Sequence, residues 1–381
     1  MRETKLLAYL VIVTLFLGGT GIVFSTVISP LHEGDLAVSS HEATLISTLS
    51  SLLRYLATAA AILVPLSFLL IYRWFGRERK FAVPACLSTI PDPALRPWQV
   101  NLLFKKDVLV FDESGFYATL LDLHRRKLIV ITMGTGGKAG VFSIRILKTS
   151  SDDPYEQRVL DVLGKLSENG MFDSGLLEKM VQEKKTNTAE ETALRYQKML
   201  ADLTVRADPT LAHQYIVDGR DHIVPLLLTS IIVFSISFMA IFLEPMQSSN
   251  LVPATVLWGV VVIQSLIAIA MPSALFGHWK DDKYREKLQW EAFTRFLSGL
   301  SLSRTSGPED LSTWGDWLVY GTALGVGDKV ESAMAALNVT LADTGVPVSA
   351  QGLSTAFSPL LHFKSPAHGR SGSSPGGAQE R

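Results

Sequence analysis

The sequence has a single cysteine, Cys86, and almost no net charge. One cysteine excludes an intrachain disulfide and any cysteine-rich zinc or iron–sulfur site. The formal net charge is −1 over 381 residues, so no overall basic field draws the chain to nucleic acid or to anionic lipid. These absences argue against a disulfide-stabilised secreted fold, a cysteine-based metal centre and a strongly basic nucleic-acid binder.

Familiar catalytic motifs are also missing. The chain contains neither H-E-x-x-H nor G-x-S-x-G, and its eight histidines are scattered. The stretch Gly134–Gly140 resembles a P-loop, but Thr132 stands where the first glycine is required and Ala139 follows Lys138. A strand is expected after it rather than a helix, so we interpret it as a hairpin turn. We therefore expect a protein that is not an enzyme, with no cofactor and no metal site.

Long apolar runs dominate what is present. Ile223–Leu243 and Leu251–Leu275 contain no Asp, Glu, Lys, Arg or His, and a helix needs about 20 apolar residues to cross the hydrocarbon core of a bilayer. Two further runs, Leu6–Ile28 and Leu52–Ile71, have the same character. The first exceeds the apolar core of a cleaved signal peptide, which favours an uncleaved signal anchor; Ser25–Val27 leaves cleavage open. The sequence thus predicts four transmembrane helices.

Basic residues fix the predicted orientation, because short loops rich in Lys and Arg stay in the cytoplasm. The loops 29–51 and 244–250 contain no Lys or Arg. Every other junction is basic, with Arg2, Lys5, Arg73, Arg77, Arg79, Lys80, Arg220, Lys280, Lys283, Arg285 and Lys287. We expect a multi-pass protein of the plasma or inner membrane with both termini in the cytoplasm.

Residues 81–221 form the only stretch long enough for a conventional soluble core, and the cytoplasmic domain is predicted at 93–221. Helices are expected at Trp98–Phe104 and Glu113–Arg126, followed by strands at Leu128–Thr132 and Val141–Leu147 around the glycine-rich turn. Asp153-Pro154 predicts the start of a further helix. Helices followed by a two-stranded hairpin are the layout of a winged-helix module. The predicted fold is therefore a membrane protein with four transmembrane α-helices and a cytoplasmic α+β, winged-helix-like domain inserted between two helical hairpins.

The remaining segments complete the predicted organisation. Helices are expected at Lys283–Leu300 and Trp314–Leu337. In order, the predicted parts are a signal anchor (1–28), an outer loop (29–51), a second span (52–71), a basic linker (72–92), the cytoplasmic domain (93–221), a third span (222–243), an outer loop (244–250), a fourth span (251–275), a cytoplasmic helical region (276–340) and a disordered tail (341–381).

Three motifs resemble the YciQ-like family of predicted membrane proteins, which carries a domain of unknown function. They are Pro93–Phe104, Gly115–Lys127 and Trp317–Val330, and the last, with its Leu324-Gly-Val-Gly-Asp-Lys329 core, is the most specific. The resemblance covers roughly residues 50–340 and implies a similar membrane topology. Family members usually have a large β-rich outer domain where this chain has only the loop 29–51. The resemblance supplies no catalytic or ligand-binding residues.

Three functional hypotheses follow. The first is a binding or scaffold subunit whose partner contacts are Arg125, Arg126 and Lys138 around the wing, or the aromatic patch Trp314, Trp317 and Tyr320. The expected partners are the lipid bilayer and a protein or a second copy of the chain.

The second hypothesis is an oligomeric transporter or channel. Its spans hold no ionisable residue away from their ends, and Gln264 is the most polar candidate for an intramembrane contact. The third is a membrane-tethered DNA-binding regulator, which the near balance of charge in the cytoplasmic domain disfavours because phosphate neutralisation supplies much of the affinity for DNA.

Overall fold

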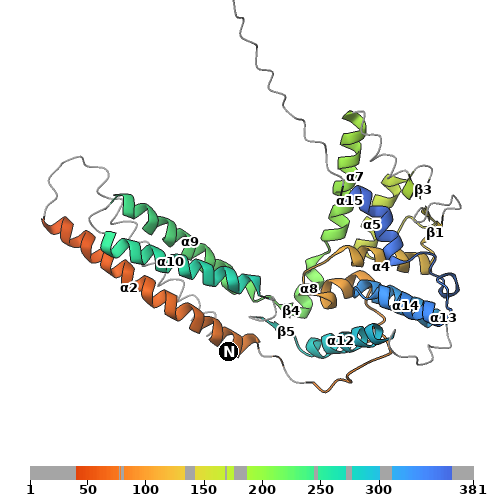
Figure 1. Ribbon diagram of the computed structural model, residues 1–381, viewed down its shortest axis with the longest axis horizontal. Helices are drawn as coiled ribbons and strands as arrows, with labels where there is room; N and C mark the ends of the chain where they lie inside the picture. The colour runs from red at the N-terminus through yellow and green to blue at the C-terminus, as the bar shows by residue number, and fades with distance from the viewer. Residues whose placement is uncertain are drawn as a thin grey trace, which may run out of the picture. The chain divides into compact units, whose positions relative to one another are not determined.

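The computed structural model describes residues 40–76, 78, 81–133, 142–167, 170–175, 187–243, 248–271, 277–300 and 311–362. The chain divides into two compact units. Unit 1 combines Met1–Ala82 with His213–Arg285, and unit 2 combines Val83–Ala212 with Glu286–Arg381. Each unit is therefore assembled from two stretches that lie far apart in the sequence (Figure 1).

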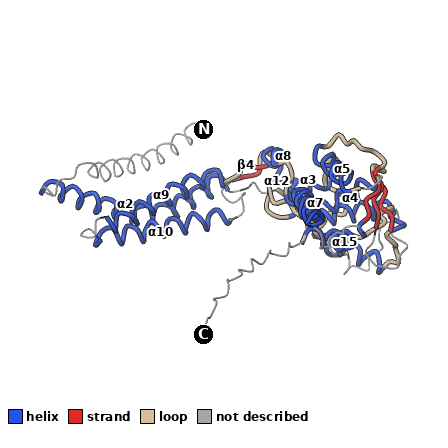
Figure 2. The backbone as a smooth tube through the Cα atoms, turned by 90° about the horizontal axis from the view of Figure 1, so that it is seen from above, coloured by secondary structure: helices blue, strands red, loops and turns tan. Residues whose placement is uncertain are grey.

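Unit 1 is built on three long helices that lie side by side in both views (Figures 1 and 2). They are α2 (Ser40–Ile71), which continues into the π-helix η2 (Tyr72–Gly76), α9 (Arg220–Leu243) and α10 (Ser248–Ala270). All three are long and apolar enough to cross a membrane. They match three of the four predicted spans; the fourth, Leu6–Ile28, lies outside the described residues.

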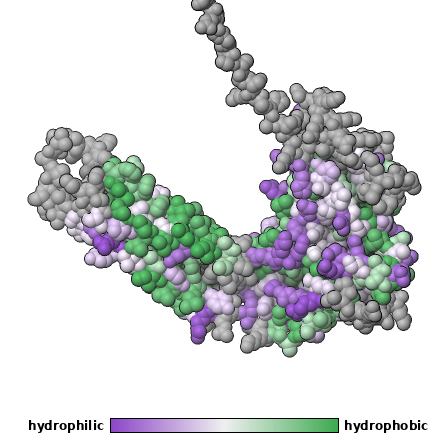
Figure 3. All heavy atoms as spheres, in the orientation of Figure 1, coloured by the Kyte–Doolittle hydropathy of each residue, from purple (hydrophilic) through white to green (hydrophobic). Residues whose placement is uncertain are grey.

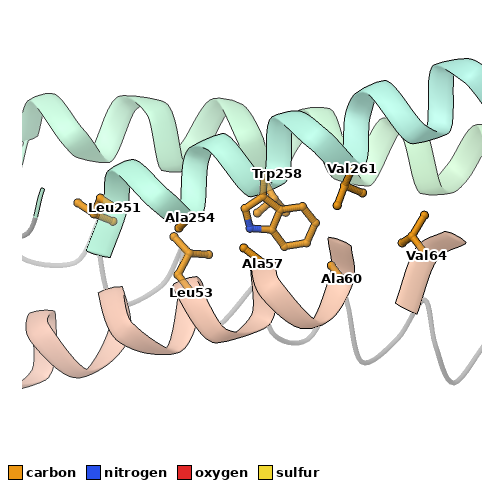
Figure 4. Close-up of a cluster of buried hydrophobic side chains, with 9 residues drawn as sticks. Leu53, Ala57, Ala60, Val64, Leu251, Ala254, Trp258 and Val261 are labelled. Carbon is orange, nitrogen blue, oxygen red and sulfur yellow. The ribbon is translucent and has the colours of Figure 1, made fainter. Parts of the chain in front are cut away.

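Small side chains let α2 and α10 approach each other closely. Ala57, Ala60 and Ala254 are buried between them, and the ring of Trp258 fills the space beside them (Figure 4). Small residues at helix contacts are typical of membrane bundles, where close packing rather than water exclusion drives association. The outward faces carry large apolar side chains such as Leu63 and Phe242, which colour this unit's surface mainly green in Figure 3.

The structure corrects the predicted loop 29–51, because α2 already begins at Ser40. The polar residues of its first turns do not interrupt the helix. Their hydroxyls bond the helix's own backbone, with Ser51 Oγ donating to the Ser47 carbonyl at 2.6 Å and Ser50 Oγ to the same carbonyl at 2.9 Å. Serine can therefore extend a membrane helix beyond its apolar run.

Unit 1 also contains a short antiparallel ribbon that the sequence pattern did not predict. The two-residue strands β4 (Ile216–Val217) and β5 (His278–Trp279) pair Ile216 with Trp279. The helix α8 (Pro209–Tyr215) leads into β4. The ribbon joins the chain entering α9 to the chain that follows α10, so it closes the base of the predicted hairpin.

Unit 2 is mostly helical with one small sheet. Its antiparallel strands β1 (Ile129–Met133), β2 (Phe142–Ile146) and β3 (Met171–Asp173) follow the order β1-β2-β3. The helices are α3 (Pro97–Val100) with the π-helix η3 (Asn101–Lys105), α4 (Glu113–Arg125), α5 (Pro154–Leu166), α7 (Asn187–Val205), α12 (Lys283–Gly299), α13 (Leu311–Ala323), α14 (Gly327–Ala336), the 3-10 helix η5 (Ala342–Thr344) and α15 (Ala350–Leu361).

Helix α4 lies at the centre of this unit. Asp112 caps its N-terminus by accepting a hydrogen bond from the Ser114 backbone N–H at 3.1 Å. Phe116, Leu120 and Leu123 are fully buried, and α3, α13, α15 and α7 all pack against this helix. The expected helix pair and hairpin are present, at nearly the predicted bounds, and α5 begins at Asp153-Pro154 as expected.

The C-terminal part of the chain corrects the predicted disordered tail 341–381. Residues 341–362 fold, and α15 inserts Leu353, Phe357 and Leu360 into the core of unit 2. The ring of Phe357 contacts Phe116 at 5.4 Å and Phe172 at 5.5 Å between ring centroids. Burial of these three apolar side chains of α15 explains why this segment folds although many of its neighbours in the sequence are polar or small. Residues 363–381 lie outside the described residues.

Two further expectations need correction. The predicted helix Trp314–Leu337 is two helices, because Gly325 adopts a left-handed φ of 78° and ends α13. The predicted linker 72–92 is also tied to the fold in its second half. The Ser88 carbonyl accepts a hydrogen bond from Trp317 Nε1 at 3.2 Å, and the Leu87 backbone N–H donates to the Ala292 carbonyl at 3.3 Å.

Candidate functional site

The two arginines proposed as partner contacts form ion pairs within unit 2. Arg125 binds Asp316 on α13. Arg126 binds Asp122 at 2.8 Å and the fully buried Glu156 at 2.5 Å. Their charges are thus compensated inside the fold, and they do not form a free basic surface. Lys138, the third residue of that group, lies outside the described residues, as does the turn Gly134–Gly140.

The aromatic residues proposed as a second group of partner contacts are buried in unit 2. Trp314 is 1% exposed, Trp317 6% and Tyr320 8%. The Tyr320 hydroxyl donates to the Leu95 carbonyl at 2.9 Å, and the Trp314 and Trp317 rings meet edge to face. Large aromatic side chains bury more apolar area than any others, which explains why this cluster forms core packing.

Gln264 makes the interhelical contact that its position suggested. Its side-chain Nε2 donates to the Ala61 carbonyl of α2 at 3.2 Å, while its Oε1 is buried without a partner. The amide therefore links α10 to α2 within unit 1. This contact is structural, and its geometry does not require a pore.

An open pocket of about 500 Å³ lies in unit 2, where the beginnings of three helices meet. Ligand pockets commonly have 300–1,000 Å³, so its size suits a small group or a side chain. Its lining comes from the end of η3, the last turn of α13, the α13–α14 turn and the N-terminal turns of α4, α14 and α15: Lys106, Asp112, Glu113, Ser114, Tyr117, Thr322, Gly325, Gly327, Asp328, Glu331, Ala350, Gln351 and Ser354.

Asp112 organises one side of this pocket. Its carboxylate accepts hydrogen bonds from Lys105 Nζ at 2.7 Å and from the buried Asn101 amide at 3.0 Å, and Lys106 Nζ lies 3.0 Å away. Burial alone would raise the pKa of Asp112, but the bonds from Lys105, Asn101 and Lys106 outweigh burial and hold the pKa at about 2. Both lysines are therefore engaged by one permanently ionised carboxylate.

The other side of the pocket carries carboxylates without such cations. The Tyr117 hydroxyl donates to Glu113 Oε2 at 2.9 Å, and burial followed by the charge of Glu113 raises the pKa of Tyr117. Glu331 Oε1 accepts from the Ala350 backbone N–H at 3.2 Å. Burial, and after it the nearby charge of Asp328, raises the pKa of Glu331. Among the described residues, no ion pair reaches Glu113 or Glu331.

Two glycines of the α13–α14 turn shape the pocket floor. A Cβ at Gly325 would lie 2.6 Å from Lys105 Cε, and one at Gly327 would lie 2.7 Å from Thr322 Oγ1. Thr322 is 2% exposed, and its Oγ1 has no hydrogen-bond partner. A buried hydroxyl without a partner costs roughly 1–3 kcal/mol. The turn thus keeps a polar atom unsatisfied at the edge of an open pocket.

Sequence reasoning missed this pocket, although one signal pointed to it. The segment Leu324–Lys329 stood out as the most specific motif, and it supplies Gly325, Gly327 and Asp328 to the lining. Tyr117 lies within the Gly115–Lys127 motif, and Glu113 precedes that motif by two residues. The N-terminal turns of α4 and α14 line the same pocket although about two hundred residues separate them, and no local sequence pattern reveals this. The described residues contain no group of three metal-ligating side chains.

A family comparison now places the chain. A family model described as "Predicted membrane protein (DUF2207) C-terminal domain" matches residues 88–334. The chain belongs to this family. The resemblance noted from the three motifs is therefore confirmed. No curated protein and no solved structure matches the chain.

The DUF2207 match covers most of unit 2 and both membrane helices α9 and α10. It includes ten of the thirteen pocket residues, from Lys106 to Glu331, and leaves out Ala350, Gln351 and Ser354 on α15. The family description records a membrane protein without an assigned activity. The pocket is therefore the main structural clue to function.

Proposed function

We propose that this DUF2207 protein is a membrane-anchored binding subunit that holds a protein partner through the pocket of unit 2. In this proposal the chain crosses the plasma or inner membrane four times, with both termini and unit 2 in the cytoplasm. The observation that carries it is the open, polar pocket at the meeting of α4, α14 and α15. A rigid helical framework presents this pocket, as a binding site requires.

The chemistry of the lining supports binding in preference to catalysis. Lys105 and Lys106 are held by Asp112, and the Tyr117 hydroxyl is held by Glu113. The raised pKa of Tyr117 leaves that hydroxyl protonated at neutral pH and unsuited to act as a base. Fixed hydrogen-bonding groups of this kind select and orient a partner.

The two alternative functions have less support. In a winged-helix regulator, α4 would be the helix that reads DNA, but residues Gly115–Leu121 of α4 are buried against the rest of unit 2. A recognition helix must present its side chains to the major groove. For a transporter, the polar Gln264 is engaged with α2. We therefore favour a protein-binding role for the same domain.

The single cysteine offers a direct test of the proposed topology. Cys86 is exposed and belongs to unit 2. A membrane-impermeant maleimide should label it in inverted membrane vesicles or permeabilised cells and leave it unlabelled in intact cells. Cys86→Ser is the matched control, which should stay unlabelled in both. Labelling in intact cells would place unit 2 outside the cytoplasm and overturn this part of the proposal.

The binding role is tested by crosslinking from within the pocket. A photoreactive phenylalanine analogue replaces Gln351, an exposed residue of the pocket rim, in the full chain in its native membrane. The control carries the same analogue at Asp161, an exposed residue of α5 outside the pocket lining. We expect one defined partner protein crosslinked from residue 351 and absent from residue 161. Crosslinks to lipid alone, or the same products from both positions, would refute the proposal.

A further inference from the structure

We infer that the pocket receives a cationic side chain, a lysine or an arginine, of the partner protein. The inference rests on the proposed binding function and adds the chemistry of what is bound. It is carried by the distribution of charge around the pocket and by the unsatisfied hydroxyl of Thr322.

The charges of the lining are unequal. Four carboxylates line the pocket, from Asp112, Glu113, Asp328 and Glu331, against the one lining cation Lys106. Lys106 and the adjacent Lys105 both form ion pairs with Asp112. The carboxylates that remain are Glu113 on α4 and Asp328 and Glu331 on α14, and a bound cation would be attracted to them.

Asp328 and Glu331 have little positive charge near them to compensate their own charges. They lie three positions apart on α14, which places them on neighbouring parts of one helix surface. Among the described residues, Asp328 forms an ion pair with its chain neighbour Lys329 at 3.4 Å, and both side chains are more than half exposed. Glu331 is half-buried and bonded to one backbone N–H. Burial is the main cause of the raised pKa of Glu331, and the charge of Asp328 adds to it. A bound cation would be attracted to both carboxylates and would offset their mutual repulsion.

Thr322 provides an independent indication of a bound group. Thr322 lines the pocket, and its buried Oγ1 finds no hydrogen-bond partner among the described residues. A Cβ at Gly327, another lining residue, would lie 2.7 Å from this atom. Buried polar atoms are normally satisfied, and an exception calls for an explanation such as a missing ligand. An ammonium or guanidinium group carries several N–H donors and no acceptor, so it can satisfy a hydroxyl and carboxylates together.

Other occupants fit less well. Helix N-termini attract anions, but here Glu113 and Asp328 already occupy the first turns of α4 and α14. A phosphate would meet them at close range and be repelled. A divalent metal needs a cluster of ligands, and the part of the chain that the structure describes contains no such cluster. A single positive charge on a flexible stem matches both the charge and the volume of the pocket.

The test uses the full chain in lipid nanodiscs and four small probes in saturation-transfer NMR. Nα-acetyl-arginine methylamide and Nα-acetyl-lysine methylamide carry the proposed group. Nα-acetyl-citrulline methylamide has nearly the shape of the arginine probe without its charge, and spermidine stands for a free polyamine. We expect saturation transfer to the side-chain protons of the two cationic amino-acid probes, at least tenfold weaker binding of citrulline, and weakening of the cationic probes when salt rises.

Variants locate the site. Asp328→Asn combined with Glu331→Gln removes two charges and keeps hydrogen-bonding atoms, including an acceptor for Ala350. We expect roughly tenfold weaker binding of the arginine probe, because two partly exposed ion pairs contribute about 0.2–1 kcal/mol each and 1.4 kcal/mol is tenfold. Asp161→Asn is the matched control and should leave binding unchanged. Equal binding of citrulline and arginine, or no effect of salt and of the double variant, would overturn the inference.

The outcomes also separate this inference from the proposed function. A partner crosslinked from residue 351 whose capture is unaffected by Asp328→Asn with Glu331→Gln would leave the binding function standing and remove the cationic side chain. Binding of the arginine probe without any crosslinked protein would show that the pocket binds a cation, but it would refute the proposed protein partner and with it the inference that the cation belongs to that partner. Spermidine bound at least tenfold more tightly than either amino-acid probe would assign the pocket to a free polyamine and overturn the protein source.

Discussion

Replacing Arg126 by Met would remove the main cation from a buried carboxylate. Glu156 is 0% exposed, and its Oε1 lies 2.5 Å from Arg126 and 3.6 Å from the more exposed Arg96. Arg126 also binds Asp122, whose pKa is raised by burial against the lowering effect of Arg126. If Arg126 is a structural residue, its loss should destabilise unit 2 strongly.

The expected size follows from the geometry. Breaking a buried ion pair from one side costs about 3–5 kcal/mol. Two features reduce this cost: Arg126 is 28% exposed, and Ser151 Oγ continues to donate to Glu156 Oε2 at 2.6 Å. We therefore expect about 3 kcal/mol. In a domain of this size about 1 kcal/mol corresponds to roughly 2–4 °C, so the melting temperature should fall by about 6–12 °C.

The assay is thermal unfolding of the full chain in nanodiscs, followed by hydrogen exchange of the α4 and α5 amides. Lys127→Met is the matched control: it removes an adjacent but exposed positive charge and should change stability by less than about 0.5 kcal/mol. Arg126 lowers the pKa of Asp122, so its loss should raise that pKa further. The resulting cost is fully present above the raised pKa and disappears as pH falls toward the lower pKa of the unfolded chain, so the deficit of Arg126→Met should shrink on the acid side. Equal losses for Arg126→Met and Lys127→Met at neutral pH would refute the reasoning.

Three other predictions use the same thermal assay. Phe357→Ala should cost about 3–5 kcal/mol, because a fully buried ring at the centre of an aromatic cluster is deleted; no loss would show that α15 is not part of the core. Gly325→Ala should cost about 1–2 kcal/mol, because φ is 78° there and Lys105 blocks a Cβ; a gain in stability would contradict it. Asp112→Asn should flatten the acid-side loss of stability, because a pKa lowered from 3.8 to about 2 gives stabilisation that is present above pH 3.8 and lost as pH falls toward 2; an unchanged pH profile would count against the lysine network.

Local features of the fold could be predicted from the sequence because they have local causes. Apolar runs specified the helices α9 and α10, and α9 ends at Leu243 as expected. Asp153-Pro154 specified the start of α5, since Asp caps the helix and Pro is suited to its first turn. The hairpin β1–β2 followed from two apolar segments around a glycine-rich turn. In each case the signal lies within a few residues of the structure it produces.

The features that escaped prediction depend on contacts between distant parts of the chain. Arg125 appears free in the sequence because Asp316, its partner, is 191 positions away. Trp317 was a candidate partner contact in the sequence. In the fold, its indole contacts Phe296 of α12 and donates a hydrogen bond to the Ser88 carbonyl. The segment around Phe357 was predicted to be part of a disordered tail. Its apolar side chains are ordered because they pack against distant residues such as Phe116 and Phe172. The pocket belongs to the same class.

The division of unit 2 along the chain has a consequence for how the pocket forms. Glu113 and Tyr117 come from the stretch before the membrane hairpin α9–α10, whereas Thr322, Asp328 and Glu331 come from the stretch after it. A chain that ends before residue 286 therefore contains five of the thirteen lining residues and lacks α13 and α15, which pack against α4. Contacts of this sequence separation form late, because closing the intervening loop costs entropy before they contribute. The pocket can be completed only after both helices of the hairpin have been synthesised, because eight of its thirteen lining residues follow that hairpin in the sequence.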